Sequence, residues 1–412
     1  MNHKRLILDR LLDRYEKSKS FKEANSRRRI FLKMGTSDFA EYDIEKPLIR
    51  ETFNSVVEDL AEKELVGFEW LKHERGNIIE RVWLNVANAE QCYFEIGRKA
   101  KRSVLDRLLD RVIELKTNAD GHWMAAFLSE TEQSIRDRAS IAGFLPADEE
   151  QALAVLEALD AVLKLNDAQC LERVFSLRCY NDSKYFEKKV KSRLAGIVKR
   201  YCIDAELSDE MSDDDALMEI GILQAPERIE FRGGIRGEIG GREIDFSIFS
   251  RGISLDTDTI KDLSIGDMGV IRTILFIENK ANYIDFLVNN QDNTWMTVFH
   301  GGFYSPSKGA FFKKIYEAAS ISGIEFYHWG DIDLGGFKMF KRLKTTIIPS
   351  LKPYLMDKGA LESRIRYGMP MDSRYGDKIR KLSEDEQLKE FREVIALMLE
   401  KNVRLEQEAF LI

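Results

Sequence analysis

The sequence is poor in the residues that build zinc sites and disulfide frameworks. Its 412 residues include five scattered histidines and four scattered cysteines. No two cysteines have C-x-x-C spacing, and no H-E-x-x-H pair occurs, so neither a zinc centre nor a disulfide framework is predicted. No apolar run approaches the ~18 residues that a membrane helix needs. The first ten residues are charged where a signal peptide would be apolar, so we expect a cytoplasmic protein with no membrane partner.

The composition is that of a globular chain with more than one domain. Hydrophobic residues make up 44% and charged residues 32% of the sequence, which excludes collagen-like and wholly disordered chains. At roughly 150 residues a domain, the length predicts two or three domains. The sequence holds no Gly-x-x-x-x-Gly-Lys-Ser/Thr loop, so any ATP hydrolysis would have to come from a partner.

Charge is distributed unevenly along the chain. The net charge of -7 argues against a uniformly basic coat for nucleic acid. Residues 1–36 nevertheless carry an excess of seven positive charges and residues 183–200 an excess of six, whereas residues 204–219 hold eight acids and no base. Local basic patches can bind phosphate, because salt screens charges beyond roughly 10 Å. In the second basic segment, the candidate DNA contacts are Lys184, Lys188 and Lys191. A solvated helix face remains the alternative.

The N-terminal part predicts a winged-helix-like domain over residues 1–95. Amphipathic helices are expected at 4–18 and 45–64, and a short strand at 28–33. A hairpin is expected from 65–72 to 78–86. Such a domain either places its second helix in the DNA major groove or docks another protein. The sequence favours DNA contact, and protein docking is the alternative.

Two further regions precede the C-terminal domain. Residues 96–175 are expected to form an almost wholly helical arm or linker, suited to a dimer contact. Residues 176–265 combine a basic helix at 183–201 with β-type runs at 228–231 and 242–249. Glycines separate the two runs, which predicts one small β element and a second unit of winged-helix type.

From residue 266 onward the pattern becomes that of a doubly wound α/β domain extending to residue 412. Buried-type strands are expected at 271–277, 295–300 and 324–329, and helices at 282–290, 307–321 and 335–346. This alternation predicts a mainly parallel sheet with helices on both faces. In such sheets, ligands bind outside the carboxyl ends of the strands.

Acidic residues follow two of these predicted strands. Glu278 comes directly after the first, and Asp331 and Asp333 come after the third. Carboxylates that converge in a crevice repel one another, and a divalent cation such as Mg²⁺ or Mn²⁺ would relieve that repulsion. Acids after strands also cap helices, which is the structural alternative. Because both acidic segments are expected at the same edge of the sheet, we favour a catalytic role over helix capping alone.

The arrangement resembles a known domain and, more narrowly, a known family. A Glu after one strand and an Asp-x-Asp after a later one is the pattern of the Toprim domain of topoisomerases, primases and nucleases. The wider motifs resemble the nuclease subunit of Wadjet anti-plasmid systems, most clearly over residues 176–412. They are Asp182-Ser183-Lys184, Ile277-Glu278-Asn279-Lys280, Phe299-His300-Gly301-Gly302-Phe303, Tyr327 to Phe337, and Arg404-Leu405-Glu406-Gln407-Glu408.

The resemblance implies a function. Subunits of this family are similar to the A subunit of type VI topoisomerase, work beside an SMC-type, condensin-like ATPase complex, and cut closed circular plasmid DNA. The resemblance further implies that the protein is a Mg²⁺- or Mn²⁺-dependent phosphodiester hydrolase. Its catalytic metal ligands would be Glu278, Asp331 and Asp333. Glu406 would be a fourth ligand. A homodimer would place two such sites on opposite strands.

Two residues near the acidic segments, Lys280 and His300, are candidate phosphate contacts, although a structural role is favoured for each. No tyrosine has the local pattern of the topoisomerase nucleophile, which favours hydrolysis. The alternatives are a tyrosine transesterase, a non-catalytic DNA-binding subunit and, last, a small-molecule α/β enzyme.

Overall fold

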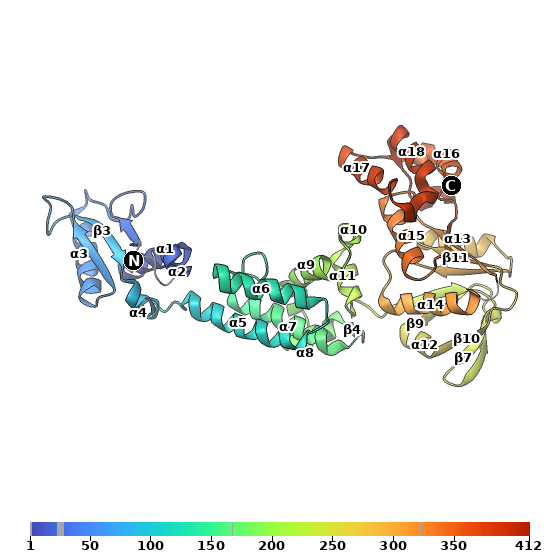
Figure 1. The fold of residues 1–412 in the computed structure, drawn as a ribbon, viewed down its shortest axis with the longest axis horizontal. Coiled ribbons are helices and arrows are strands. Elements are labelled where there is room, and N and C mark those ends of the chain that lie inside the picture. The colour runs from blue at the N-terminus through green and yellow to red at the C-terminus, as the bar shows by residue number, and fades with distance from the viewer. Residues whose placement is uncertain (1, 23–28, 167, 321–322) are drawn as a thin grey trace. The chain divides into compact units, whose positions relative to one another are not determined.

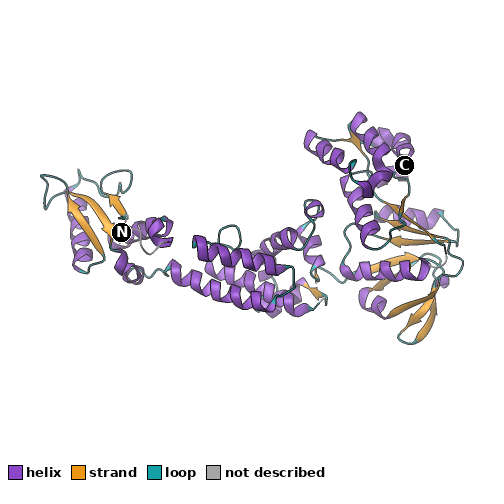
Figure 2. Cartoon of the chain, in the orientation of Figure 1, coloured by secondary structure: helices purple, strands orange, loops and turns teal. Residues whose placement is uncertain are grey.

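The chain folds into two compact units, Met1–Asp160 and Ala161–Ile412 (Figure 1). The computed structural model describes residues 2–22, 29–166, 168–320 and 323–412. Figure 2 shows helices throughout the chain, and strands mainly near the N-terminus and in the C-terminal half. Across the described ranges, no helix combines the length and apolarity required to cross a bilayer.

The first unit begins with helices packed on a three-stranded antiparallel sheet of order β1-β3-β2. Leu8, Leu11 and Leu12 lie on the buried face of the first helix and join one core with Phe53 and Val82. The expected helices at 4–18 and 45–64 and the hairpin are confirmed, and residue 28 of the expected strand lies outside the described residues. The elements are α1 (His3–Lys17), α2 (Lys19–Lys22), β1 (Phe31–Lys33), α3 (Pro47–Glu62), β2 (Val66–Trp70), β3 (Ile79–Leu84) and α4 (Ala89–Glu95).

The expected helical region is confirmed over most of its length. Helix α5 (Lys101–Asn118) packs against α6 (Met124–Arg138), and α7 (Glu149–Leu165) continues beyond residue 160. Helix α6 ends at Ala139, which has a left-handed backbone with φ of 48°. The region expected at 96–175 is interrupted near its end, because Cys170–Leu171 form strand β4, which pairs with β5 (Ile222–Leu223).

The second unit opens with helices that carry the basic and acidic segments. The expected basic helix at 183–201 appears as a π-helical turn at Phe186–Val190 that leads into α9 (Lys191–Tyr201). The acidic segment then forms α10 (Ala205–Ser208) and α11 (Asp213–Glu219), and α8 (Glu172–Tyr180) precedes both segments. Ser212 and Asp215 form a capping box at the start of α11, which explains why this acid-rich stretch is helical there.

A six-stranded, mainly parallel sheet of order β14-β13-β11-β12-β6-β9 forms the centre of the second unit. Strands β11 (Thr273–Ile277), β12 (Trp295–Phe299) and β13 (Glu325–Trp329) are parallel, as the sequence predicts. The remaining strands are β14 (Lys352–Pro353), parallel to β13, and the antiparallel pair β6 (Arg228–Arg232) and β9 (Ile253–Asp256).

The single small β element expected between residues 228 and 249 is wrong, because its two runs belong to different sheets. Strand β6 joins the main sheet, where Phe231 lies beside Val298 of β12. Strand β8 (Arg242–Asp245) instead lies in a small antiparallel sheet with β7 (Arg236–Ile239) and β10 (Leu263–Asp267). The expected boundary at residue 265 therefore separates β6 and β9 from the sheet to which they belong. Helix α12 (Thr257–Asp262) connects β9 to β10.

Helices cover both faces of the main sheet. Phe286 of α13 (Lys280–Asn289) contacts Trp295 and Trp329 on one face. On the other face, Phe312 of α14 (Pro306–Ala319) contacts Phe276. Phe340 of α15 (Leu334–Thr346) contacts His328 on this second face.

The helix that follows β11, α13, thus lies on one face of the sheet, and the helix that follows β13, α15, lies on the other. Because β11 and β13 are neighbours, the topological switch point of the sheet lies between them. The chain ends in a helical subregion beside this sheet. It comprises α16 (Lys358–Arg364), β15 (Met369–Pro370), α17 (Ser373–Leu382), α18 (Arg392–Lys401) and β16 (Val403–Arg404).

Packing on the α14 face predicts a large effect of truncating Phe312. This ring is fully buried and contacts Phe276, His300 and Tyr304. Phe312→Ala should destabilise the second unit by about 3–5 kcal/mol because it leaves a cavity. Ile248→Ala, at a side chain that is 73% exposed, should change stability by less than ~0.5 kcal/mol. Urea unfolding of the full chain measures both, and equal effects would contradict this packing.

Candidate metal centre

The acids predicted from the sequence meet at the carboxyl ends of β11 and β13. These strands pair in parallel with Ile277 opposite Trp329, so the residues that follow them lie at one edge. The Glu278 backbone N–H donates to the Trp329 carbonyl at 2.9 Å, and the Glu278 carboxylate accepts the Asp331 backbone N–H. The Glu278 Oε2 atom is buried and has no hydrogen-bond partner in the part of the chain that the structure describes. A buried carboxylate oxygen without a donor is suited to a cation.

Asp333 combines a structural and a functional position. It caps α15, where its Oδ1 accepts the Gly336 backbone N–H at 2.8 Å. The Tyr375 hydroxyl donates to Asp333 Oδ2 at 3.4 Å, and the Arg404 guanidinium lies 3.8 Å from the same oxygen. The capping role that was the structural alternative is therefore real, and the same side chain still adds negative charge to the centre.

Glycines allow the two acidic loops to approach this closely. A Cβ atom on Gly330 would overlap Glu278 Oε2 and would lie 2.9 Å from His328 Cε1. A Cβ on Gly336 would overlap the backbone of Asp331. Both positions need glycine because of the close approach, since neither has a left-handed backbone.

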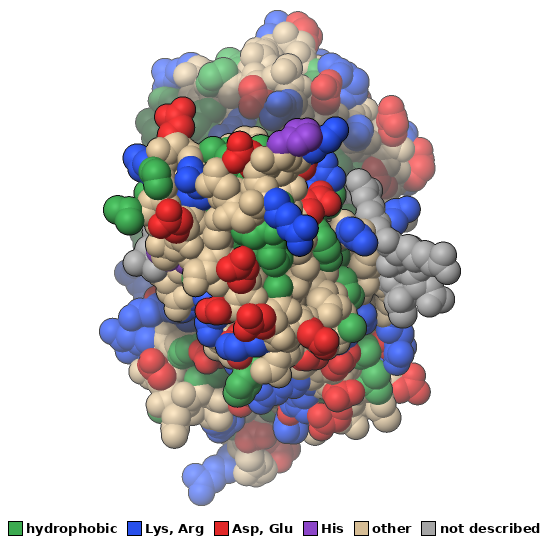
Figure 3. Space-filling model, turned by 90° about the vertical axis from the view of Figure 1, so that its left-hand side faces the viewer, with side chains coloured by type: hydrophobic (Ala, Val, Ile, Leu, Met, Phe, Trp, Pro, Cys, Tyr) green, Lys and Arg blue, Asp and Glu red, His purple; other side chains and the backbone are tan. Residues whose placement is uncertain are grey.

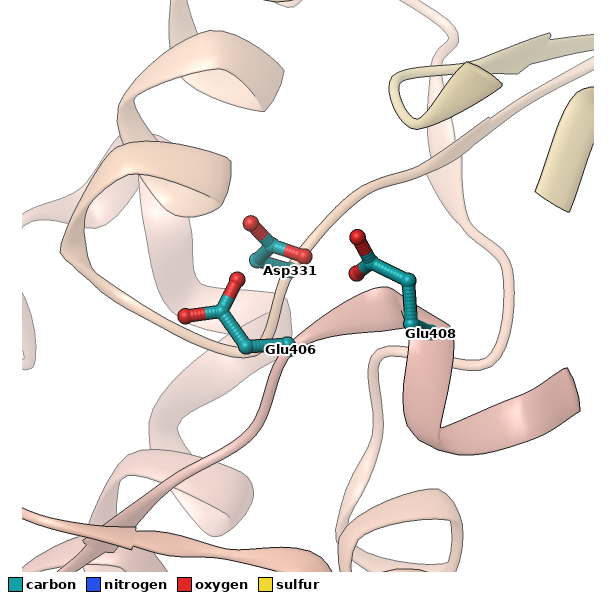
Figure 4. A group of neighbouring side chains, drawn as sticks. All are labelled: Asp331, Glu406 and Glu408. Atoms are coloured by element: carbon teal, nitrogen blue, oxygen red, sulfur yellow. The ribbon is translucent and has the colours of Figure 1, made fainter. Parts of the chain in front are cut away.

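The C-terminal segment brings two more carboxylates to this edge. Ile332 and Leu405 exchange backbone hydrogen bonds of 2.9 and 3.1 Å, which sets Glu406 and Glu408 beside Asp331 (Figure 4). One carboxylate oxygen from each of these three acids lies within 4.8 Å of the others. Glu406 thus lies beside Asp331, and its role as a metal ligand stays a prediction. Glu408 was not predicted, although it lies in the same C-terminal motif.

The electrostatics of the centre favour binding of a positive charge. Burial, together with the charges of Asp331, Asp333 and Glu406, raises the pKa of Glu278 to about 8. Burial and the neighbouring Asp333 raise the pKa of Asp331 to about 7. Burial likewise raises the pKa values of Asp333 and Glu406. Carboxylates that resist ionisation together, with oxygen ligands at hand, fit a hard divalent cation.

The two predicted phosphate contacts near this edge differ in their exposure. Lys280 is 46% exposed, pairs with Glu230 and lies above the Phe299 ring. His300 is completely buried and stacks on Phe312. A DNA contact by His300 therefore does not fit this structure, because its side chain points into the α14 face of the sheet, as the alternation along β12 requires.

The basic segment is only partly available to DNA. Lys184 and Lys188 are exposed. Lys191 is not available, because it pairs with Glu172 at 2.8 Å and with Asp214 at 2.6 Å. Helix α11 packs against α9, and its Asp214 neutralises the charge of Lys191. Counting the charges of residues 183–200 alone does not reveal this contact.

The exposed face of α3 is acidic. In a winged helix this would be the helix that enters the major groove. It exposes Glu51, Glu58, Asp59 and Glu62, and Arg50 is its one basic residue. In Figure 3, acidic and basic side chains are interspersed on the face in view. The sequence favours DNA contact by this domain, whereas the acidic face of α3 favours protein docking for this helix.

Tyrosines near the basic segment and near the centre pack against other groups of the described residues. Tyr180 and Tyr185 stack on each other, with ring centroids 4.7 Å apart. The sequence did not single out Tyr375, which lies beside Asp333. Its hydroxyl accepts the Leu334 backbone N–H at 2.9 Å, and burial raises its pKa to about 12. Tyr375 therefore connects Asp333 to the first residue of α15.

The raised pKa values predict how stability depends on pH. The ordinary pKa of Glu is 4.5, and the folded-state pKa of Glu278 is about 8. The native state therefore binds the extra proton between these pH values, and stability falls as pH rises from about 4.5 to about 8. In EDTA, Glu278→Gln should melt at a higher temperature than the wild type at pH 8, with a smaller difference at pH 5. Calorimetry at both pH values measures this, and an equal difference at both would contradict the assigned electrostatics.

Comparison with known proteins agrees with the resemblance seen in the sequence. Residues 236–412 match the family model described as Wadjet protein JetD, C-terminal. The chain is also 29% identical over 415 residues to the Wadjet protein JetD of Bacillus cereus (strain Q1). That alignment covers 99% of this chain and 98% of the relative. The predicted resemblance is confirmed: the chain is similar to a Wadjet protein JetD along its length, and its C-terminal part matches the JetD family model.

Proposed function

We propose that this protein is a metal-dependent DNA endonuclease that cuts plasmid DNA as part of an SMC-type Wadjet defence complex. The observation that carries the proposal is the convergence of Glu278, Asp331, Asp333 and Glu406 at the switch point of a parallel sheet. The strand order and the positions of these acids support assigning the domain as Toprim. The helices and three-stranded sheet of the first unit support a winged-helix assignment.

The proposed roles follow from the contacts of each residue. Glu278, Asp331, Asp333 and Glu406 would hold Mg²⁺ or Mn²⁺. Glu408 would join them, since Asp331, Glu406 and Glu408 each have a carboxylate oxygen within 4.8 Å of the others. Bound cations of this kind polarise the scissile phosphate and lower the pKa of water. Tyr375 and Arg404 orient Asp333. Lys280 at the centre, and Lys184 and Lys188 on the basic segment, supply positive charge for the DNA backbone.

Partners complete the proposal. The sequence has no phosphate-binding loop for ATP, so an SMC-type ATPase complex would supply the energy for recognising closed circles. A homodimer would bring two centres to opposite strands and so yield a double-strand break. The acidic face of α3 is suited to docking within such an assembly.

Cleavage of supercoiled plasmid tests the assignment. Purified protein with Mg²⁺ or Mn²⁺, alone and with its ATPase partners, should cut plasmid and should stop cutting in EDTA. Glu278→Gln should abolish cutting, because it removes a negatively charged ligand. The matched control Glu238→Gln, at an exposed acid on β7, should cut normally. Products are scored on agarose gels before and after protease treatment.

Other outcomes of that assay decide between the alternatives. Metal-dependent cutting that survives in Glu278→Gln would refute the proposed centre. A protein–DNA adduct that persists after denaturation would identify a tyrosine transesterase. Normal plasmid restriction in cells by the Glu278→Gln variant would identify a non-catalytic subunit.

A second prediction concerns the glycine against which Glu278 packs. Gly330→Ala should displace the Glu278 carboxylate, because the new Cβ would overlap Oε2. We expect reduced cleavage and weaker Mn²⁺ binding from a protein that still folds, since a side-chain terminus can move. Gly376→Ala is the control, because its Cβ would meet no atom within 4 Å. Unchanged Mn²⁺ affinity in Gly330→Ala would show that this packing does not position the carboxylate.

A further inference from the structure

We propose that Gln407 is the positioning residue of the acidic centre: it holds Asp331 and the end of β11 in the arrangement that binds the cation. The inference rests on the proposed metal-dependent function. Gln407 lies between Glu406 and Glu408 and is fully buried. It is therefore closed to DNA and solvent, and it can act only through its neighbours.

Hydrogen bonds from Gln407 reach each of the segments that form the centre. Its backbone N–H donates to Asp331 Oδ1 at 2.6 Å. Its side-chain Oε1 accepts the Asn279 backbone N–H at 2.9 Å, and its Nε2 donates to the Trp329 carbonyl at 3.3 Å. Its carbonyl accepts from Asn282 Nδ2 at 2.8 Å. One residue thus connects the ends of β11 and β13, helix α13 and the C-terminal segment.

These contacts bear directly on the acids. The Trp329 carbonyl that receives Gln407 Nε2 also receives the Glu278 backbone N–H. Asn279, whose N–H Gln407 accepts, follows Glu278 in the chain and donates from its side chain to Glu408 at 2.6 Å. The Gln407 N–H holds Asp331 Oδ1 and so sets the orientation of the whole carboxylate. Gln407 therefore orients three acids without adding charge.

An amide is the group that these contacts require. One side chain must accept the Asn279 backbone N–H and also donate to the Trp329 carbonyl. The neutral amide of glutamine can do both. Glutamate could not donate to the Trp329 carbonyl when ionised, and it would add a negative charge beside acids that already repel one another. Methionine has a similar length but supplies neither hydrogen bond.

Mn²⁺ binding to the full chain tests the proposal. Isothermal titration and the electron paramagnetic resonance signal of bound Mn²⁺ would be compared for the wild type, Gln407→Met and Gln407→Glu, well below their melting temperatures. We expect Mn²⁺ affinity to fall by about 10–100-fold in Gln407→Met, as when an outer-shell contact of a metal site is lost. The variant keeps the backbone N–H on Asp331 but loses both side-chain contacts to the ends of β11 and β13. The control Met398→Ala removes a buried side chain from α18. It should lower the melting temperature and leave Mn²⁺ affinity unchanged.

The outcomes separate this inference from the proposed function. If the wild type binds Mn²⁺ and Gln407→Met binds it equally well, Gln407 has no positioning role and the metal centre stands. If the wild type binds no Mn²⁺, both proposals are overturned. If Gln407→Met does not fold, Asn282→Ala is the second variant. It removes only the hydrogen bond from Asn282 to the Gln407 carbonyl and should disturb folding less. A smaller loss of affinity there supports the proposal, and unchanged affinity overturns it.

Discussion

Parallel pairing of β11 with β13 is the constraint on which the candidate centre depends. It sets Ile277 opposite Trp329, so the segments that follow both strands leave the sheet at one edge. The connections then turn to opposite faces, which opens the edge for Glu278 and Asp331. The backbone bridge between Ile332 and Leu405 adds the last segment of the chain to the same place. Pairing between segments far apart in the chain thus brings the acids of the centre to one edge.

This arrangement works against the preference of carboxylates to stay apart and hydrated. Burial and mutual repulsion raise their pKa values, and the Oε2 atom of Glu278 is buried without a donor. Part of the cost is offset within the protein by Arg404 and by backbone N–H donors at Asp331 and Asp333. The remainder is what a divalent cation would relieve. The raised pKa values and the proposed metal binding thus have one physical origin.

Elsewhere in the molecule, opposite charges are largely satisfied within the chain. Acidic α11 pairs with α9 through Lys191 and Lys199, and Arg342 of α15 pairs with Glu219. Such pairing removes basic side chains from any DNA interface and leaves Lys184 and Lys188 exposed. Of the three candidate lysines of this segment, two therefore remain exposed.

The sequence by itself determined the alternation of strands and helices after residue 271 and the acids at the strand ends. Both follow from local hydrophobic patterning and from the geometry of parallel sheets. Tertiary structure alone decided that β6 joins the main sheet, that His300 is buried, and that Glu408 and Gln407 belong to the centre. These features rest on pairings between segments far apart in the chain, such as Asn279 with Gln407, and hydrophobic periodicity carries no information about which distant segments meet.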